Sequence, residues 1–282
     1  LGLLARRQYT GLALPTLFLS LGCIAAFVSL IALSVRETIP LWLAMPLQTY
    51  VLIIMFNPLH EAVHSNLTFA RPAFRWIDKS VGFAAGAMML LPFPMFRHTH
   101  LAHHARTNTE DVDPDLWTNV KGKARVTLAC LTIQYAYLRM YLAFFLAARR
   151  GDRSWSGLAG TALVLVLALI SLAIAPRFAL ALWIIPAWLA VSMIEFLHWS
   201  LHRPHASSEK YLNAKIIFAT GWRHYLLRLL YQDLNCHLIH HLYPHVPFYR
   251  LEKTFPLMRK ALKKNGAAIV SAKRSFREIW HS

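Results

Sequence analysis

Four long apolar runs dominate the hydrophobic pattern of this chain. They cover residues 12–35, 41–59, 157–175 and 178–199, and each approaches the roughly 20 apolar residues that a membrane-spanning helix needs. Only short connections separate the first run from the second and the third from the fourth. The pattern therefore predicts four spanning helices in two hairpins, with a kink at Pro186 inside the fourth.

Two further apolar stretches are interrupted in ways that argue against spanning helices. Residues 81–96 are short and contain Pro92 and Pro94, which predicts a re-entrant or interfacial segment. Residues 126–148 carry Arg139 and three tyrosines, which predicts a helix lying along the membrane surface. We therefore expect an all-α integral membrane fold: one domain over residues 1–282, with interfacial helices and a histidine-rich helical cap from 60–156 and 200–282.

The charge of the chain predicts its orientation. Hydrophobic residues make up 56% of the sequence, yet 30 Lys and Arg face only 13 Asp and Glu. Of these basic residues, only Arg36 and Arg177 fall in the predicted hairpin turns, as the positive-inside rule expects for turns on the outer side. Both termini and the cap are then cytoplasmic, and we expect a bacterial inner membrane. The apolar runs disfavour nucleic-acid binding, and three widely separated cysteines predict no disulfide framework.

The chemistry of the chain is indicated by its histidines. Fourteen of fifteen lie in or near clusters on the predicted cytoplasmic side, in the boxes HEAVH (60–64), HTHLAHH (98–104) and HLIHH (237–241) and at the inner end of the fourth span. Helical positions i, i+3 and i+4 share one face, so each HxxHH box directs three imidazoles the same way. One metal ion takes four to six donors. About nine donors are too many for one ion and suit two.

These boxes resemble those of the membrane fatty-acid desaturase superfamily, which includes acyl desaturases, acyl hydroxylases and carotenoid hydroxylases and ketolases. HEAVH resembles the first box, HTHLAHHARTNTEDVDPD the second with its acidic tail, and NCHLIHHLYPHVPFYRL the third. The resemblance covers about residues 56–251. It implies a non-haem diiron centre, with O2 as co-substrate and ligands at the box positions: His60, His64, His100, His103, His104, His237, His240 and His241.

The resemblance leaves two alternatives for a ninth ligand. Acyl-CoA desaturases have a histidine five residues before an Arg-Pro pair, which is His198 here, whereas carotenoid ketolases have one directly before it, which is His202. We prefer His198 and keep His202 as the alternative. His98 and His245 are extra histidines, expected near the centre or on the polar surface.

Carboxylates that orient the imidazoles are the next expectation. The candidates are Glu61, Glu195, Asp111, Asp113, Asp115 and Asp233, with Glu195 favoured because it lies within a span. Trp199, Trp222 and Tyr231 are candidates for a substrate channel. The sequence has no HPGG segment typical of a fused cytochrome b5, so we expect a separate electron donor such as a ferredoxin, a rubredoxin or a cytochrome b5.

The resulting functional hypothesis is O2-dependent oxidation of an unactivated C–H bond in a lipid chain, with fatty-acyl desaturation preferred. The alternative within the superfamily is hydroxylation or ketolation of a fatty acid or carotenoid. A rival outside it is a membrane zinc metalloprotease, because HEAVH also satisfies HExxH with Glu61 as general base. That hypothesis leaves both HxxHH boxes unexplained. A histidine-rich metal carrier would place its ligands along the spans rather than at one membrane face.

Overall fold

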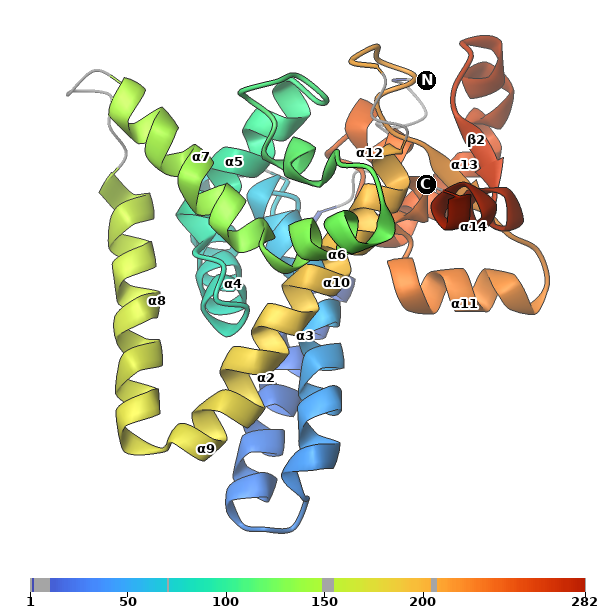
Figure 1. Cartoon of the computed structure of the whole chain (residues 1–282). Helices are drawn as coiled ribbons and strands as arrows, with labels where there is room; N and C mark the ends of the chain where they lie inside the picture. Colours follow the sequence, from blue (N-terminus) through green and yellow to red (C-terminus); the bar gives the residue numbers. More distant parts are fainter. Residues whose placement is uncertain (1, 3–10, 70, 149–154, 204–206, 282) are drawn as a thin grey trace.

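The computed structural model describes residues 2, 11–69, 71–148, 155–203 and 207–281 (Figure 1). Four of its helices are long and apolar enough to cross a membrane. They are α2 (Leu14–Val35), α3 (Leu41–Val63), α8 (Trp155–Ile174) and a composite helix over Pro176–His202. The expected all-α membrane architecture is confirmed.

The spanning helices extend further at their inner ends than the apolar runs do. The second run stops at residue 59, but α3 continues to Val63 and so carries His60 within its last turn. The fourth helix likewise continues through His202. Histidines at these positions are therefore held by the same rigid backbone that crosses the membrane.

The fourth span is built from three pieces: α9 (Pro176–Ala179), a π turn η4 (Leu180–Ile184) and α10 (Ile185–His202). The irregularity expected around Pro186 takes the form of this π turn. Proline has no N–H to donate and its ring crowds the preceding turn, and a wider π turn is one way in which a helix accommodates such a break.

A sharp bend separates α4 (Arg75–Met88) from α5 (Phe93–Ala105), whose axes differ by 101°. This bend falls inside the segment expected to be re-entrant or interfacial. Gly86 makes it possible, because a Cβ there would lie 2.7 Å from the carbonyl oxygen of Leu91. Figure 1 shows α4 beside the spans and α5 in the cap above them.

The single surface helix expected over residues 126–148 is wrong. The structure has α6 (Lys123–Leu131) and α7 (Ile133–Ala147), bent by 61° at Thr132. Thr132 leaves the helical region and its Oγ1 accepts a hydrogen bond of 2.9 Å from the Trp117 indole. The Trp117 side chain, from an earlier segment, thus stabilises the break between the two helices.

The cap contains short helices and one small sheet that the sequence did not indicate. Strands β1 (Ile216–Phe218) and β2 (Ile269–Ser271) pair in parallel, with Ile217 opposite Val270. The remaining cap elements are η1 (Pro72–Phe74), η2 (Pro114–Thr118), α11 (Trp222–Tyr231), η5 (Leu234–Cys236), α12 (His237–Leu242), α13 (Phe248–Lys264) and α14 (Ala272–His281). Figure 1 shows the hairpin turns of the spans at one end of the molecule and the cap at the other.

Candidate metal centre

Nine histidines converge where the inner ends of α3 and α10 meet α5 and α12 of the cap. Each box lies on a helix or at its end, so the i, i+3, i+4 spacing directs its imidazoles to one side as expected. The metal-ligating atoms of these nine fall into two groups, each with all ligand atoms within 4.8 Å of one another.

The first group brings together histidines of α3, α5 and α12. Its members are His60, His64, His100, His104 and His240. Their Nε2 atoms face one another: that of His100 lies 3.1 Å from that of His64 and 3.0 Å from that of His104, and the His104 and His240 atoms are 2.9 Å apart. This group offers five nitrogen donors.

The second group contains His103, His202, His237 and His241. The His237 Nε2 lies 3.0 Å from that of His202 and 3.2 Å from that of His241, which is 3.3 Å from the His103 Nε2. The groups adjoin, because the rings of His104 and His241 stack with centroids 4.3 Å apart. The arrangement provides two neighbouring sets of donors, five and four in number.

The chemistry of the donor set fits two transition-metal ions. Burial, and then the neighbouring imidazoles, lower the pKa values of His104, His240 and His241 well below the usual range, so these rings are neutral, which is the form that binds metal. Within the part of the chain that the structure describes, neither ring nitrogen of the fully buried His60 has a hydrogen-bond partner. Nitrogen donors suit iron and its neighbours rather than Mg²⁺ or Ca²⁺.

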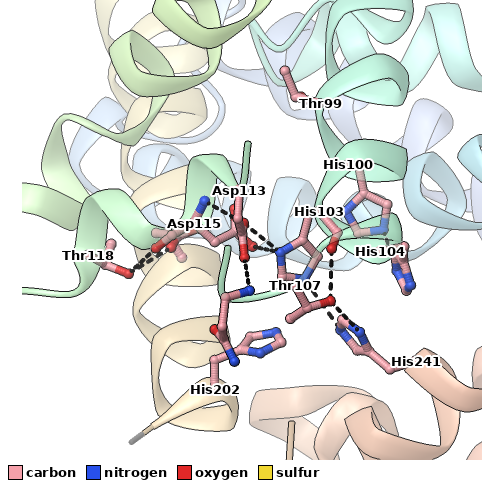
Figure 2. Close-up of polar contacts among 12 residues, drawn as sticks. Thr99, His100, His103, His104, Thr107, Asp113, Asp115, Thr118, His202 and His241 are labelled. Carbon is pink, nitrogen blue, oxygen red and sulfur yellow. Dashed lines mark hydrogen bonds and ion pairs between the residues drawn. The ribbon is translucent and has the colours of Figure 1, made fainter. Parts of the chain in front are cut away.

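Hydrogen bonds to Nδ1 direct the Nε2 atoms of His103, His202 and His241 in the second group inward. Figure 2 shows those of His103 and His241. His103 Nδ1 lies 2.7 Å from Asp113 Oδ1, and His202 Nδ1 lies 2.8 Å from the carbonyl oxygen of Asn213. Thr107 Oγ1 donates to the His103 carbonyl and lies 3.3 Å from His241 Nδ1. An acceptor at Nδ1 places the proton there and leaves the Nε2 lone pair for a metal.

The Asp113 carboxylate is hydrogen-bonded to His103 of this centre. Its side chain also accepts hydrogen bonds from the backbone N–H groups of Asn108 (2.7 Å) and Asp115 (3.0 Å), which hold it in place. Asp115 Oδ2 approaches His103 Nδ1 at 3.4 Å. Burial by itself would lower the pKa of His103, but the two carboxylates outweigh it and raise that pKa to about 9. Without metal the ring therefore also holds a proton on Nε2, and a metal ion bound at Nε2 would take the place of that proton.

Glu195, the carboxylate favoured from the sequence, is connected to His103 only through Tyr137 and Asp115. It approaches the hydroxyls of Thr118 and Tyr137 at 3.5 Å each. Tyr137 in turn donates a 3.0 Å hydrogen bond to Asp115. A buried chain of polar groups therefore runs from the span through the cap to His103. Tyr137 had no recognisable signal in the sequence, because it comes from α7, an element separate from the histidine boxes.

Two other candidate carboxylates serve different contacts. Glu61 accepts hydrogen bonds of 3.3 Å from the Asn66 amide and from the backbone N–H of Phe248, so it ties the end of α3 to the start of α13. Asp233 forms an ion pair of 2.9 Å with Arg228. Both stabilise the cap around the histidines.

His198 lies beside the centre but outside both groups. Its ring stacks on His237 with centroids 5.4 Å apart and meets the edge of Phe56 at 5.2 Å. Of the two alternatives for the ninth position, it is His202 whose Nε2 lies among the other donors.

The remaining candidates lie further away. His98 packs its ring against Tyr141 with centroids 5.6 Å apart, and His245 Nδ1 lies 3.4 Å from Asn66 Oδ1. Asp111 is exposed in the loop after α5. Pro204, which belongs to the Arg-Pro pair used to compare the two alternatives for the ninth position, is outside the described residues.

Apolar cavities adjoin His198. One of about 20 Å³ lies between α3, α10 and α11 and is lined by Phe56, Ile194, Leu230 and Tyr231 among others. A second of about 10 Å³ lies on the other side of Phe56, against Glu195. Of the three aromatic residues considered for a channel, Tyr231 lines the first cavity, Trp199 is buried beside α6, and Trp222 is exposed.

Comparison with known proteins gives a family and distant relatives. The family model described as fatty acid desaturase matches residues 37–273. A chloroplastic omega-3 fatty acid desaturase of Brassica napus is 23% identical over 219 residues, which cover 67% of this chain and 54% of the relative. A chloroplastic sn-2 acyl-lipid omega-3 desaturase (ferredoxin) of Arabidopsis thaliana is also 23% identical, covering 67% and 49%. A fatty acid conjugase of Calendula officinalis is 24% identical, covering 76% and 67%. The chain thus spans about half the length of the first two.

Proposed function

The chain belongs to the fatty acid desaturase family, and from this premise we propose that it oxidises an unactivated C–H bond of a lipid chain with O2, preferably as a fatty-acyl desaturase. The observation that carries the proposal is the convergence of nine histidines, seven of them buried and two half-buried, into adjoining groups of five and four donors. A pair of iron ions held there supplies the oxidising power for C–H cleavage.

We propose the nine grouped histidines as the iron ligands, with His202 in the ninth position. His198 then has a different task, because it stands between the second group and the apolar cavities. With Phe56 and Ile194 it shapes the place where a methylene of the substrate meets the centre. An apolar lining keeps water away from that carbon and directs oxidation to the chain rather than to solvent.

Hydroxylation or ketolation is the second candidate, and one observation favours it. In the resemblance noted above, a histidine directly before Arg-Pro belongs to carotenoid ketolases, and it is His202 that joins the second group. The metalloprotease hypothesis is disfavoured by the contacts of Glu61, which is bound to Asn66 and Phe248, and by a five-histidine group around HEAVH.

The electron donor and the membrane side belong to the same proposal. A relative carries ferredoxin in its name, which supports a separate ferredoxin-type donor. A cap that is rich in Lys and Arg suits an acidic donor and, by the positive-inside rule, the cytoplasmic face. The relatives named above are plant proteins and give no support to the expected bacterial membrane.

The test is product formation in a host with a simple lipid profile, followed by mass spectrometry of fatty acids and supplied carotenoids. A product lacking one pair of hydrogen atoms establishes desaturation, and one carrying an added oxygen atom moves the function to the second candidate. His100→Ala should abolish either product, whereas His98→Ala, on the same helix but outside both groups, should retain it. An unchanged lipid profile, with zinc in the purified protein, would overturn the proposal.

A further inference from the structure

Helix α11 has an apolar face that the described part of the chain leaves uncovered. At about 100° of rotation per residue, His224, Leu227 and Tyr231 share one face, and Leu227 and Tyr231 are buried there against the end of α10 and the small sheet. The opposite face carries five exposed apolar side chains, which we call the α11 stripe: Trp222, Tyr225, Leu226, Leu229 and Leu230.

The exposure of the stripe is large for side chains of this kind. Trp222 is 69% and Tyr225 72% exposed, and Leu229 at the centre of the stripe is 53% exposed. Arg223 borders the stripe beside Leu230 by the same helical geometry, whereas Arg228 lies nearer the packed face and is ion-paired with Asp233 and Glu252. Tryptophan, tyrosine and leucine on one face, with an arginine at the edge, are typical of a helix lying in the membrane interface.

The contacts of α11 decide which way the stripe faces. On the packed face, His224 Nδ1 lies 3.1 Å from Glu252 Oε1 of α13, within the cap. The stripe therefore points away from the cap. In Figure 1, α11 lies across the direction of the spans, at the edge of the cap that borders the spanning part.

We propose that the α11 stripe is seated in the interfacial layer of the bilayer that holds the spans. The bilayer is the occupant favoured here because the spans place its surface at this level, and because Arg223 beside the stripe can reach a lipid phosphate while the stripe enters the acyl region. Exposed tryptophan and tyrosine at that level are typical of the membrane–water interface.

The stripe also borders the apolar cavity next to the metal centre. Leu230 belongs to the stripe and, with the neighbouring Tyr231, lines the apolar cavity that ends at His198. In the membrane-seated arrangement, α11 is the wall between the lipid and that cavity. An acyl chain would then enter from the bilayer past Leu230, with side chains moving apart because the cavity holds only about 20 Å³. This second step rests on the proposed function.

Spin labels test the seating of the stripe without any turnover. The full chain, in vesicles of phosphatidylcholine and phosphatidylglycerol, is labelled at Leu226→Cys or Leu229→Cys and compared with Lys264→Cys, an exposed position at the end of α13. Stripe labels should collide more with dissolved oxygen and several-fold less with a water-soluble nickel chelate than the control label. Stripe labels as accessible to nickel as Lys264→Cys would overturn the proposal. The three native cysteines are buried, and the unmutated chain measures their background.

Two tryptophan variants test whether α11 separates the lipid from the cavity. Leu230→Trp should block the cavity and remove most of the product while the metal content stays unchanged. Leu229→Trp, one residue away on the lipid-facing stripe, should keep the product. Full product from Leu230→Trp would refute the entry route. If the unmutated chain yields no product, the proposed function fails instead, and the label accessibilities still decide the seating.

Discussion

Replacing Asp113 by Asn removes the negative charge that is hydrogen-bonded to His103 Nδ1 and changes little else. The side chain is 3% exposed and accepts from His103 Nδ1 at 2.7 Å and from two backbone N–H groups. An amide keeps the shape but offers one neutral acceptor. Hydrogen bonds to charged groups contribute about 1.5–3 kcal/mol against about 1 for neutral ones. The interaction of residue 113 with His103 should therefore weaken by about 0.5–2 kcal/mol in the variant.

That loss should appear in how tightly the metal is held. About 1.4 kcal/mol corresponds to a factor of 10, and loss of a carboxylate behind a metal-bound histidine typically costs about 10–100-fold in metal affinity. We expect Asp113→Asn to release its iron to chelators roughly tenfold more readily. The assay is iron per chain after exposure to chelators of graded strength, together with the thermal unfolding midpoint.

Asp78→Asn is the matched control for this variant. Asp78 is also 3% exposed and accepts hydrogen bonds from the backbone N–H of Leu67 and the hydroxyl of Thr68, but it is in neither histidine group. Both variants should unfold at somewhat lower temperature, and only Asp113→Asn should lose iron. Equal iron retention in the two would refute the role assigned to Asp113.

Three further outcomes follow from the same structure. Removing metal with a chelator should lower the unfolding midpoint, because a ligand at 100 times its Kd stabilises by about 2.7 kcal/mol; an unchanged midpoint would argue against metal in the buried centre. His202→Ala should reduce the bound iron by one ion per chain while His198→Ala keeps both, and the reverse would restore the assignment preferred from the sequence. Gly86→Ala should destabilise the chain by about 1–3 kcal/mol, because its Cβ would meet backbone atoms at 2.7 Å. Gly22→Ala, with open space around it, should not, as thermal unfolding would show.

The sequence determined the elements that build the centre. Apolar runs long enough to span a bilayer have few alternatives to helices, because every backbone polar group must be satisfied inside the lipid. Helical spacing determined that each box presents its imidazoles to one side. The number of donors, and from it the expectation of two metal ions, followed from these local rules.

The tertiary structure decided how the donors divide and which neighbours support them. His198 and His202 are one helical turn apart on the same face of α10, so local spacing cannot separate them. The difference of about 6 Å along the helix axis matters only once α10 is packed against α12, where His202 meets His237 at 3.0 Å.

The supporting carboxylate was decided in the same way. Six acidic residues qualified by sequence, and Asp113 reaches His103 because the loop after α5 folds back on that helix. The break at Thr132 likewise depends on Trp117, fifteen residues earlier. The spacing of residues within a helix determines which of its side chains point the same way. Contacts between elements depend on how far each helix is shifted and rotated against its neighbours, and packing alone sets this.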